Sequence, residues 1–147
     1  MRLTTFSDYT LRVLVYLGVH DESLVTIGDI AAAYDISENH LMKVVHYLGQ
    51  HRYIETVRGK GGGMRLARAP EKINVGELVR GTEENLKFVE CFDRKASDCR
   101  IEAACVIRGM LGRALEAFFG VLDRYTLADL LAPKPRLLKM LTLVPAR

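Results

Sequence analysis

The fold of this chain is decided by residues 26–67, which read TIGDIAAAYDISENHLMKVVHYLGQHRYIETVRGKGGGMRLA. Thr26 is a suitable N-cap for a short helix, because its side-chain oxygen can accept a hydrogen bond from a first-turn N–H. Ser37 can cap a second helix after a brief connection at residues 34–36. Apolar side chains then recur at helical spacing, at Leu41, Val44, Val45 and Leu48. The stretch therefore opens with two helices joined by a tight turn.

A glycine-rich hairpin follows these two helices. Residues 53–58 have the composition of a strand, residues 59–63 are four glycines around one lysine, and residues 64–67 read as the returning strand. Two helices followed by a hairpin are typical of a winged helix-turn-helix. We therefore expect a mostly α-helical fold, with the helix-turn-helix at about residues 26–50 and a two-stranded wing at residues 53–67.

The helix after Ser37 is the expected recognition helix, because residues near the start of such a helix enter the major groove of DNA. Asn39 and His40 lie there, and Asn39 can read adenine. Lys43 can read guanine or hold a phosphate. Thr26 and Ser37, at two helix starts, suit phosphate contacts as well as capping. The alternative for Asn39 and His40 is that they are ordinary exposed helix residues.

The tip of the hairpin is the second candidate DNA contact. It places two cations on a turn with almost no side-chain bulk, and glycine backbone can approach a phosphate or a minor-groove wall closely. The candidate residues are Arg58, Gly59, Lys60, Gly61 and Gly62. The alternative is a merely flexible hairpin tip.

The charge of the chain is concentrated in one segment. The 147 residues carry a net charge of +3, whereas residues 52–72 alone carry +4, so the remainder sums to −1. A local basic patch favours a phosphate-contacting surface, although a solvated basic loop has the same composition. No apolar run approaches the roughly 18 residues that cross a bilayer. Residues 1–10 lack the layout of a secretory signal, so we expect a cytoplasmic protein that does not enter a membrane.

The flanking segments extend this unit into a single predicted domain at residues 1–131. Residues 1–80 form its winged helix-turn-helix part, with Ser7 as the predicted N-cap of the first helix. Pro133 and Pro135 end a last short helical turn, which leaves residues 132–147 as a C-terminal tail.

Two further segments follow the winged unit. Residues 81–105 are polar and without clean periodicity, which indicates a functional loop. Residues 106–125 form a long helix that is too apolar for so small a chain to cover alone. We therefore expect it to be a dimerisation helix in a homodimer.

The polar loop holds the three cysteines of the chain, Cys91, Cys99 and Cys105. Their gaps of seven and five residues differ from the Cys-x-x-Cys pairs of structural zinc, and nothing nearby resembles a catalytic cysteine–histidine pair. Three thiolates on such a loop suit iron–sulfur ligation, with a fourth ligand supplied from elsewhere. Unligated or redox-sensing cysteines are the alternative.

These stretches together resemble a known family. From Met1 to about Leu131 the chain is similar to the NsrR-like repressors, nitric-oxide sensors within a superfamily of iron–sulfur winged-helix regulators that also contains IscR-like proteins. The matching stretches are residues 3–9, 11–12, 37–43, 57–63 and 125–130, together with the cysteine triplet. The resemblance implies a dimeric repressor of nitric oxide detoxification genes that binds palindromic double-stranded operator DNA.

The resemblance also implies a ligand set for the cluster. IscR-like proteins have a histidine three residues after the third cysteine, whereas this chain has Arg108, which argues against a 2Fe–2S cluster of that type. NsrR-like proteins hold a 4Fe–4S cluster with an aspartate from the first helix of the partner subunit. The matching residue is Asp8, which the residues alone would assign to favourable interaction with the helix dipole.

Two other functions stay open at this point. One keeps the fold and the DNA binding but makes iron or cluster supply the signal. The other is a thiol redox protein that binds no DNA. The sequence contains no convincing catalytic constellation, so we do not expect an enzyme.

Overall fold

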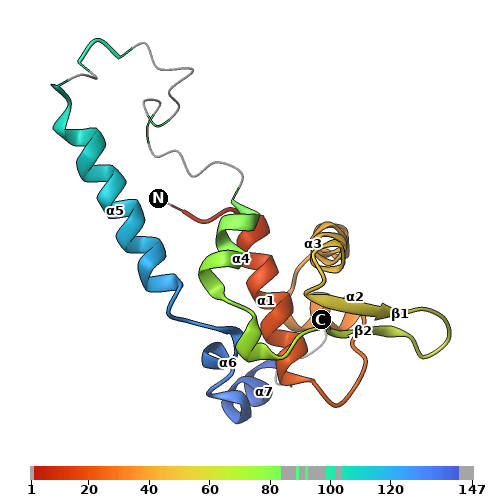
Figure 1. Ribbon diagram of the computed structural model, residues 1–147. Coiled ribbons are helices and arrows are strands. Elements are labelled where there is room, and N and C mark those ends of the chain that lie inside the picture. The colour runs from red at the N-terminus through yellow and green to blue at the C-terminus, as the bar shows by residue number, and fades with distance from the viewer. Residues whose placement is uncertain (1, 84–88, 90–91, 93–98, 102–103, 143–147) are drawn as a thin grey trace.

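The computed structural model of the chain is drawn in Figure 1 and describes residues 2–83, 89, 92, 99–101 and 104–142. Its central element is helix α1 (Thr5–Val19), whose side chains Val13, Leu14 and Leu17 are buried in the main core. Helices and the wing surround α1, so most of the core is built against this one helix.

The start of α1 differs from the prediction. Thr4, not Ser7, is its N-cap, and the Thr4 side chain accepts a hydrogen bond from the N–H of Ser7 at 3.2 Å. Ser7 is buried, and its hydroxyl donates to Thr82 Oγ1 at 2.8 Å. The prediction was wrong because this tertiary partner, 75 residues away, places Ser7 inside the helix.

Helices α2 (Ile27–Tyr34) and α3 (Glu38–Gln50) form the predicted helix-turn-helix. Thr26 caps α2 in a capping box, since its hydroxyl accepts from the N–H of Asp29 and the Asp29 carboxylate accepts from the N–H of Thr26. Asp35 ends α2 in the left-handed conformation, at φ 53°, which turns the chain sharply into α3. Ile30 of α2 and Leu41 of α3 are completely buried in the main core.

The predicted wing is also confirmed. Strands β1 (Ile54–Val57) and β2 (Gly63–Leu66) pair antiparallel, with Val57 opposite Gly63 at the tip. Met64 in addition bridges to Val25, before α2, so the base of the wing is joined to the helix-turn-helix. The predicted mostly α-helical winged helix-turn-helix class is therefore correct.

The chain then returns to α1 through the short 3-10 helix η1 (Pro70–Lys72) and helix α4 (Val75–Thr82). Helix α5 (Val106–Leu122) projects from this body, to which it is attached near its C-terminal end, and α6 (Leu127–Leu130) joins the core through the buried Leu127. Figure 1 shows α5 and the wing at opposite ends of the molecule. Helix α5 ends three residues earlier than the predicted boundary at 125.

Helix α7 (Lys134–Thr142) occupies much of the segment for which we expected only a tail. Pro135 does not prevent it, because a proline in the first helical turn lacks only an N–H that has no partner there. Leu141 packs against the main core, and Lys134 Nζ donates to Asp21 Oδ1 at 2.7 Å. Within the described residues, no helix has the length and apolar character needed to cross a membrane.

Candidate nucleic-acid interface and cysteine site

The first half of α3 presents the predicted reading residues to solvent. Asn39, His40 and Lys43 are all exposed, while Leu41 and Val44 on the other face of the helix are buried. The ring of His40 lies 6.3 Å from the ring of Tyr9, so α1 supports this end of α3. The helix therefore offers amide, imidazole and ammonium groups together, which suits contacts to base edges and phosphates.

Two exposed residues of the same face were missed by the sequence reasoning. Met42 is 51% exposed although it is large and apolar, and His46 is exposed one turn further on. Their spacing from Asn39, three and seven positions, is the signal that could have found them. A methionine on a reading surface suits contact with the methyl group of thymine.

The two predicted phosphate contacts at helix starts differ from each other. The hydroxyl of Thr26 donates to Asp29 Oδ2 at 2.7 Å, so its side chain is committed to the capping box beside a carboxylate. Ser37 is exposed at the N-cap position of α3, and its side chain makes no capping hydrogen bond. Ser37 is therefore the better placed of the two for a phosphate.

The tip of the wing has the backbone that its glycines predicted. Gly59 and Gly61 adopt φ values of 103° and 77°, which side chains other than glycine rarely tolerate. Gly62 donates its N–H to the carbonyl of Gly59 at 2.9 Å and closes the turn. Arg58 and Lys60 are exposed on this turn, so the wing presents two cations on a narrow, smooth projection.

Two cations of the basic segment at 52–72 have partners within the described part of the subunit, unlike those at the wing tip. Arg65 pairs with Glu55 across the wing. Arg68 donates to the carbonyls of His51 and Arg52, at 2.6 and 2.9 Å, and its guanidinium lies 4.4 Å from the centre of the Tyr53 ring. These two arginines are engaged by partners within the subunit, which charge counting alone could not reveal.

Asp8 lies in the first turn of α1, where its carboxylate pairs with Arg12 at 2.9 Å. Both side chains are a little over 40% exposed and border an open pocket of about 620 Å³ between α1 and the turn that joins α2 to α3. Tyr34 also lines this pocket, 5.6 Å from the Arg12 guanidinium, and burial raises its pKa so that the phenol stays protonated. Asp8 is thus accessible from outside the subunit.

The cysteines are described only in part. Cys91 lies outside the described residues, Cys99 is exposed, and Cys105 is half-buried at the N-cap of α5. Arg108 follows on the first turn of α5. Among the residues that the structure describes, no three Cys, His, Asp or Glu side chains gather as a metal site, so one subunit does not bring Asp8, Cys99 and Cys105 together.

The donor chemistry of this region nevertheless fits an iron–sulfur cluster. Thiolates are the usual protein ligands of such clusters, and both described cysteines have access to the surface. Cys105 also stands at the N-terminus of a 17-residue helix, whose dipole favours negatively charged groups such as a thiolate-bound cluster.

Comparison with known proteins gives a consistent result. The model of the Rrf2 family, described as iron-dependent transcriptional regulators, matches residues 3–133. The chain is 52% identical to the HTH-type transcriptional regulator NsrR of Geobacillus kaustophilus, over 96% of this chain and 97% of that protein. It is 46% identical to the regulator of the same name from Bacillus licheniformis, over 97% of this chain and all of that one.

A solved structure also resembles this chain. The T. potens IscR superimposes with a TM-score of 0.71 at 29% identity, covering 89% of this chain and 86% of that one. The similarity therefore extends over most of the fold.

Proposed function

This chain belongs to the Rrf2 family of iron-dependent transcriptional regulators, and we propose that it is a dimeric repressor that releases operator DNA in response to nitric oxide. The observation that carries the proposal is its similarity, along nearly the whole chain, to regulators named NsrR. The cysteine triplet at 91, 99 and 105 supports the same conclusion, because it supplies thiolate ligands for iron.

DNA reading in this proposal rests on two exposed groups of residues. The first turns of α3 offer Asn39, His40 and Lys43 to the major groove, with Ser37 at a phosphate. The wing tip offers Lys60 and its glycine backbone to the neighbouring minor groove or phosphates. A homodimer would repeat these groups on a palindromic operator.

The cluster in this proposal is held by Cys91, Cys99 and Cys105 of one subunit and by Asp8 of the partner subunit. When bound, a 4Fe–4S cluster would supply iron that nitric oxide attacks, most readily where the ligand is a carboxylate, a weaker partner for this iron than thiolate. Arg108 favours this assignment over the 2Fe–2S alternative, because it stands where a histidine ligand would be expected.

Asp8 has two competing partners under this proposal. Its Oδ2 atom lies 2.9 Å from Arg12 Nη2 of its own helix, so this arginine would compete with the iron of the other subunit for the carboxylate. Helix α1 packs directly on the recognition helix α3, so a change at Asp8 is transmitted to the DNA-reading unit by one rigid element. The two states would differ in how the two reading units are held relative to each other.

The proposal is tested by titrating nitric oxide into protein that was purified without air and bound to its operator. We expect the absorbance of the cluster to bleach and the operator affinity to fall by about tenfold or more, at least 1.4 kcal/mol. A Cys99→Ser/Cys105→Ser protein is the control, and its affinity should not respond to nitric oxide. Unchanged affinity of the wild-type protein after complete bleaching would contradict the sensor function.

The role of Asp8 is tested separately by Asp8→Ala. We expect an altered absorption spectrum and faster loss of acid-labile sulfide, because the fourth ligand is missing. Asp21→Ala, which removes another exposed acid, is the matched control and should leave the spectrum unchanged. A wild-type spectrum for Asp8→Ala would return Asp8 to a purely helix-stabilising role.

A second candidate signal is iron or cluster supply, which the iron-dependent description of the family favours. Separate titrations with an iron chelator, oxygen and nitric oxide distinguish the signals. Release of the operator by chelator alone would favour iron supply. A thiol redox protein, the remaining alternative, predicts colourless protein without salt-dependent DNA binding.

A further inference from the structure

Helix α5 is attached to the rest of its subunit near its C-terminal end. Phe119 is buried there, in a small apolar cluster with Val75 and Val79 of α4. Towards the other end of α5, Val106 is 78% exposed and Met110 is 51% exposed. The orientation of the whole helix therefore depends on how its last turn is fixed to α4.

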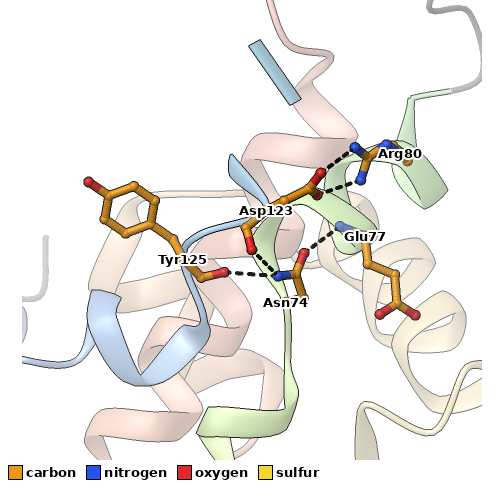
Figure 2. A network of polar contacts seen from close by, with 5 residues as sticks. All are labelled: Asn74, Glu77, Arg80, Asp123 and Tyr125. Carbon is orange, nitrogen blue, oxygen red and sulfur yellow. Dashed lines mark hydrogen bonds and ion pairs between the residues drawn. The ribbon is translucent and has the colours of Figure 1, made fainter. Parts of the chain in front are cut away.

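A bidentate ion pair fixes this turn. The two guanidinium nitrogens of Arg80, on α4, lie 2.6 and 2.7 Å from the two carboxylate oxygens of Asp123, the residue that ends α5 (Figure 2). Two parallel hydrogen bonds between planar groups define a direction as well as a distance. The same guanidinium lies 4.3 Å from the centre of the Phe119 ring, so it is held from a second side by α5.

Asn74 joins the same two helix ends through other atoms. Its side-chain oxygen accepts from the N–H of Glu77 at 2.9 Å and so caps the start of α4. Its side-chain nitrogen donates to the carbonyls of Asp123 and Tyr125, at 2.8 and 3.4 Å, as Figure 2 shows. The Asn74 side chain thus hydrogen-bonds to backbone groups both at the beginning of α4 and at the end of α5.

Gly76 removes the remaining freedom between the two helices. It is buried, and a Cβ at this position would overlap Asp123 Oδ1 and lie 3.0 Å from the Asp123 nitrogen. The backbone of α4 therefore contacts Asp123 directly, with no side chain between them. The packing is close enough that the angle between α4 and α5 has little room to vary.

The ion pair has little value for stability by itself. The side chains of Arg80 and Asp123 are each 42% exposed, and exposed ion pairs contribute little to stability because water screens them. Its distinctive property is geometric, since it is bidentate, stacked on an aromatic ring and seated against a glycine. A role in orientation accounts for these features together.

We propose that Arg80 and Asp123 form the joint that sets the angle between the dimerisation helix and the DNA-reading unit, and thereby the operator half-site spacing that the dimer accepts. The proposal rests on the dimer of the proposed function, in which α5 contacts its counterpart. Each reading unit is then positioned relative to the two-fold axis through this joint. Arg80 and Asp123 are positioning residues and do not touch DNA.

The test compares wild-type protein with Arg80→Ala, Asp123→Asn and the double variant. The DNA is a palindrome selected by the wild-type protein from random duplexes, together with versions whose half-sites are one base pair closer or further apart. Sedimentation velocity gives the oligomeric state, thermal unfolding gives the stability, and anisotropy titrations give the affinity for each spacing. Lys134→Ala, which removes a similarly exposed ion pair elsewhere, is the matched control.

We expect the wild-type protein and Lys134→Ala to prefer the selected spacing by about tenfold, the effect of roughly one poorly made base contact. Both single variants should stay dimeric and folded while this preference falls to about threefold or less. The double variant should lose no more than either single variant, because all three remove the same pair.

Two results would overturn the proposal, and they have different meanings. If the single variants keep the wild-type spacing preference, or their effects add in the double variant, the joint has no role and the dimer stands. If the wild-type protein is a monomer, the dimer of the proposed function fails and the joint fails with it, whereas a wild-type dimer that binds all spacings equally overturns the joint alone.

Discussion

At the residue scale, the surroundings of a cation decide whether it contacts DNA or holds the fold. Lys60 is exposed at the tip of the wing, on a turn built from glycines. Arg68, in the same basic segment, donates to two carbonyls at the end of α3 and stacks on Tyr53. Equal charge in the sequence therefore corresponds to two different environments in the structure.

This division predicts opposite effects for two substitutions. Lys60→Ala should weaken operator binding and reduce the slope of log affinity against log salt concentration by about 1, without changing stability. Arg68→Ala should lower the free energy of unfolding by about 2 kcal/mol, because it removes charged hydrogen bonds to carbonyls at the end of α3, and should leave the salt slope unchanged. Anisotropy in a salt series and urea denaturation measure the two quantities. Equal salt slopes for both variants would contradict the division.

Asn39 carries a prediction about base discrimination. Asn39→Ala should reduce the preference for the selected operator over a version altered at the contacted adenine by about 1–3 kcal/mol, because a bidentate amide contact is lost. Binding to random DNA should hardly change, since phosphate contacts supply that affinity. Competition titrations with the two duplexes measure the effect. Glu38→Ala, beside it on the exposed surface of α3, is the control for a general disturbance of the helix.

At the element scale, local signals predicted the helix-turn-helix and the wing well. The capping box at Thr26 and the glycines of residues 59–63 each determine their element through neighbours in the sequence. Ser7 was misjudged as a cap because its hydroxyl bonds to Thr82, far along the chain. Helix α7 was missed because two prolines suggest a stop, whereas the second of them stands in a first helical turn.

The capping box at the start of helix α6 predicts how the stability of the protein changes at acidic pH. The Asp129 carboxylate accepts from the N–H and the hydroxyl of Thr126, at 2.7 and 2.8 Å, and these hydrogen bonds hold the pKa of Asp129 below its ordinary value of 3.8. A carboxyl whose folded pKa is lowered stabilises the fold above its unfolded pKa, and this contribution is lost as the pH falls through the folded value.

Asp129→Asn should therefore reduce stability at neutral pH and flatten the fall in stability below about pH 4, the region where an unperturbed aspartate titrates. Chemical denaturation at a series of pH values, compared with wild-type protein, measures this. An Asp129→Asn protein with the full wild-type slope on acidification would show that the capping box does not contribute.

At the scale of the whole molecule, the main unburied apolar surface in the described part of the chain lies on α5. Val106, Ile107, Met110 and Val121 of this helix are all at least half exposed. Met110→Asp should shift the protein to a monomer and weaken operator binding by about 100-fold, because the second half-site is no longer bound intramolecularly. Sedimentation velocity and anisotropy measure both effects. Glu116→Lys changes the charge of the same helix at a polar position and should stay dimeric.

The candidate site was predictable only where its residues act locally. The exposed positions of Asn39 and Lys43 follow from their places at the start of a predicted helix, whereas the site formed by the three cysteines stays a prediction. The pairing of Asp8 with Arg12, and of Arg80 with Asp123 across 43 residues, depends on how helices pack. No local pattern encodes such distances, so these contacts required the structure.

The length of helix α5 determines how far its free end moves when its orientation changes. Its 17 residues make a rod about 25 Å long, at 1.5 Å per residue, that is anchored near one end. A tilt of about 10° at the anchor displaces the far tip by roughly 4 Å, more than the rise of one base pair in a duplex whose helical turn measures about 34 Å. A tilt of about 10° at Asp123 would thus shift the far end of α5 by more than one base-pair step. The Asp123 carboxylate accepts hydrogen bonds from Arg80 at both oxygens, and this bidentate contact restricts such a tilt.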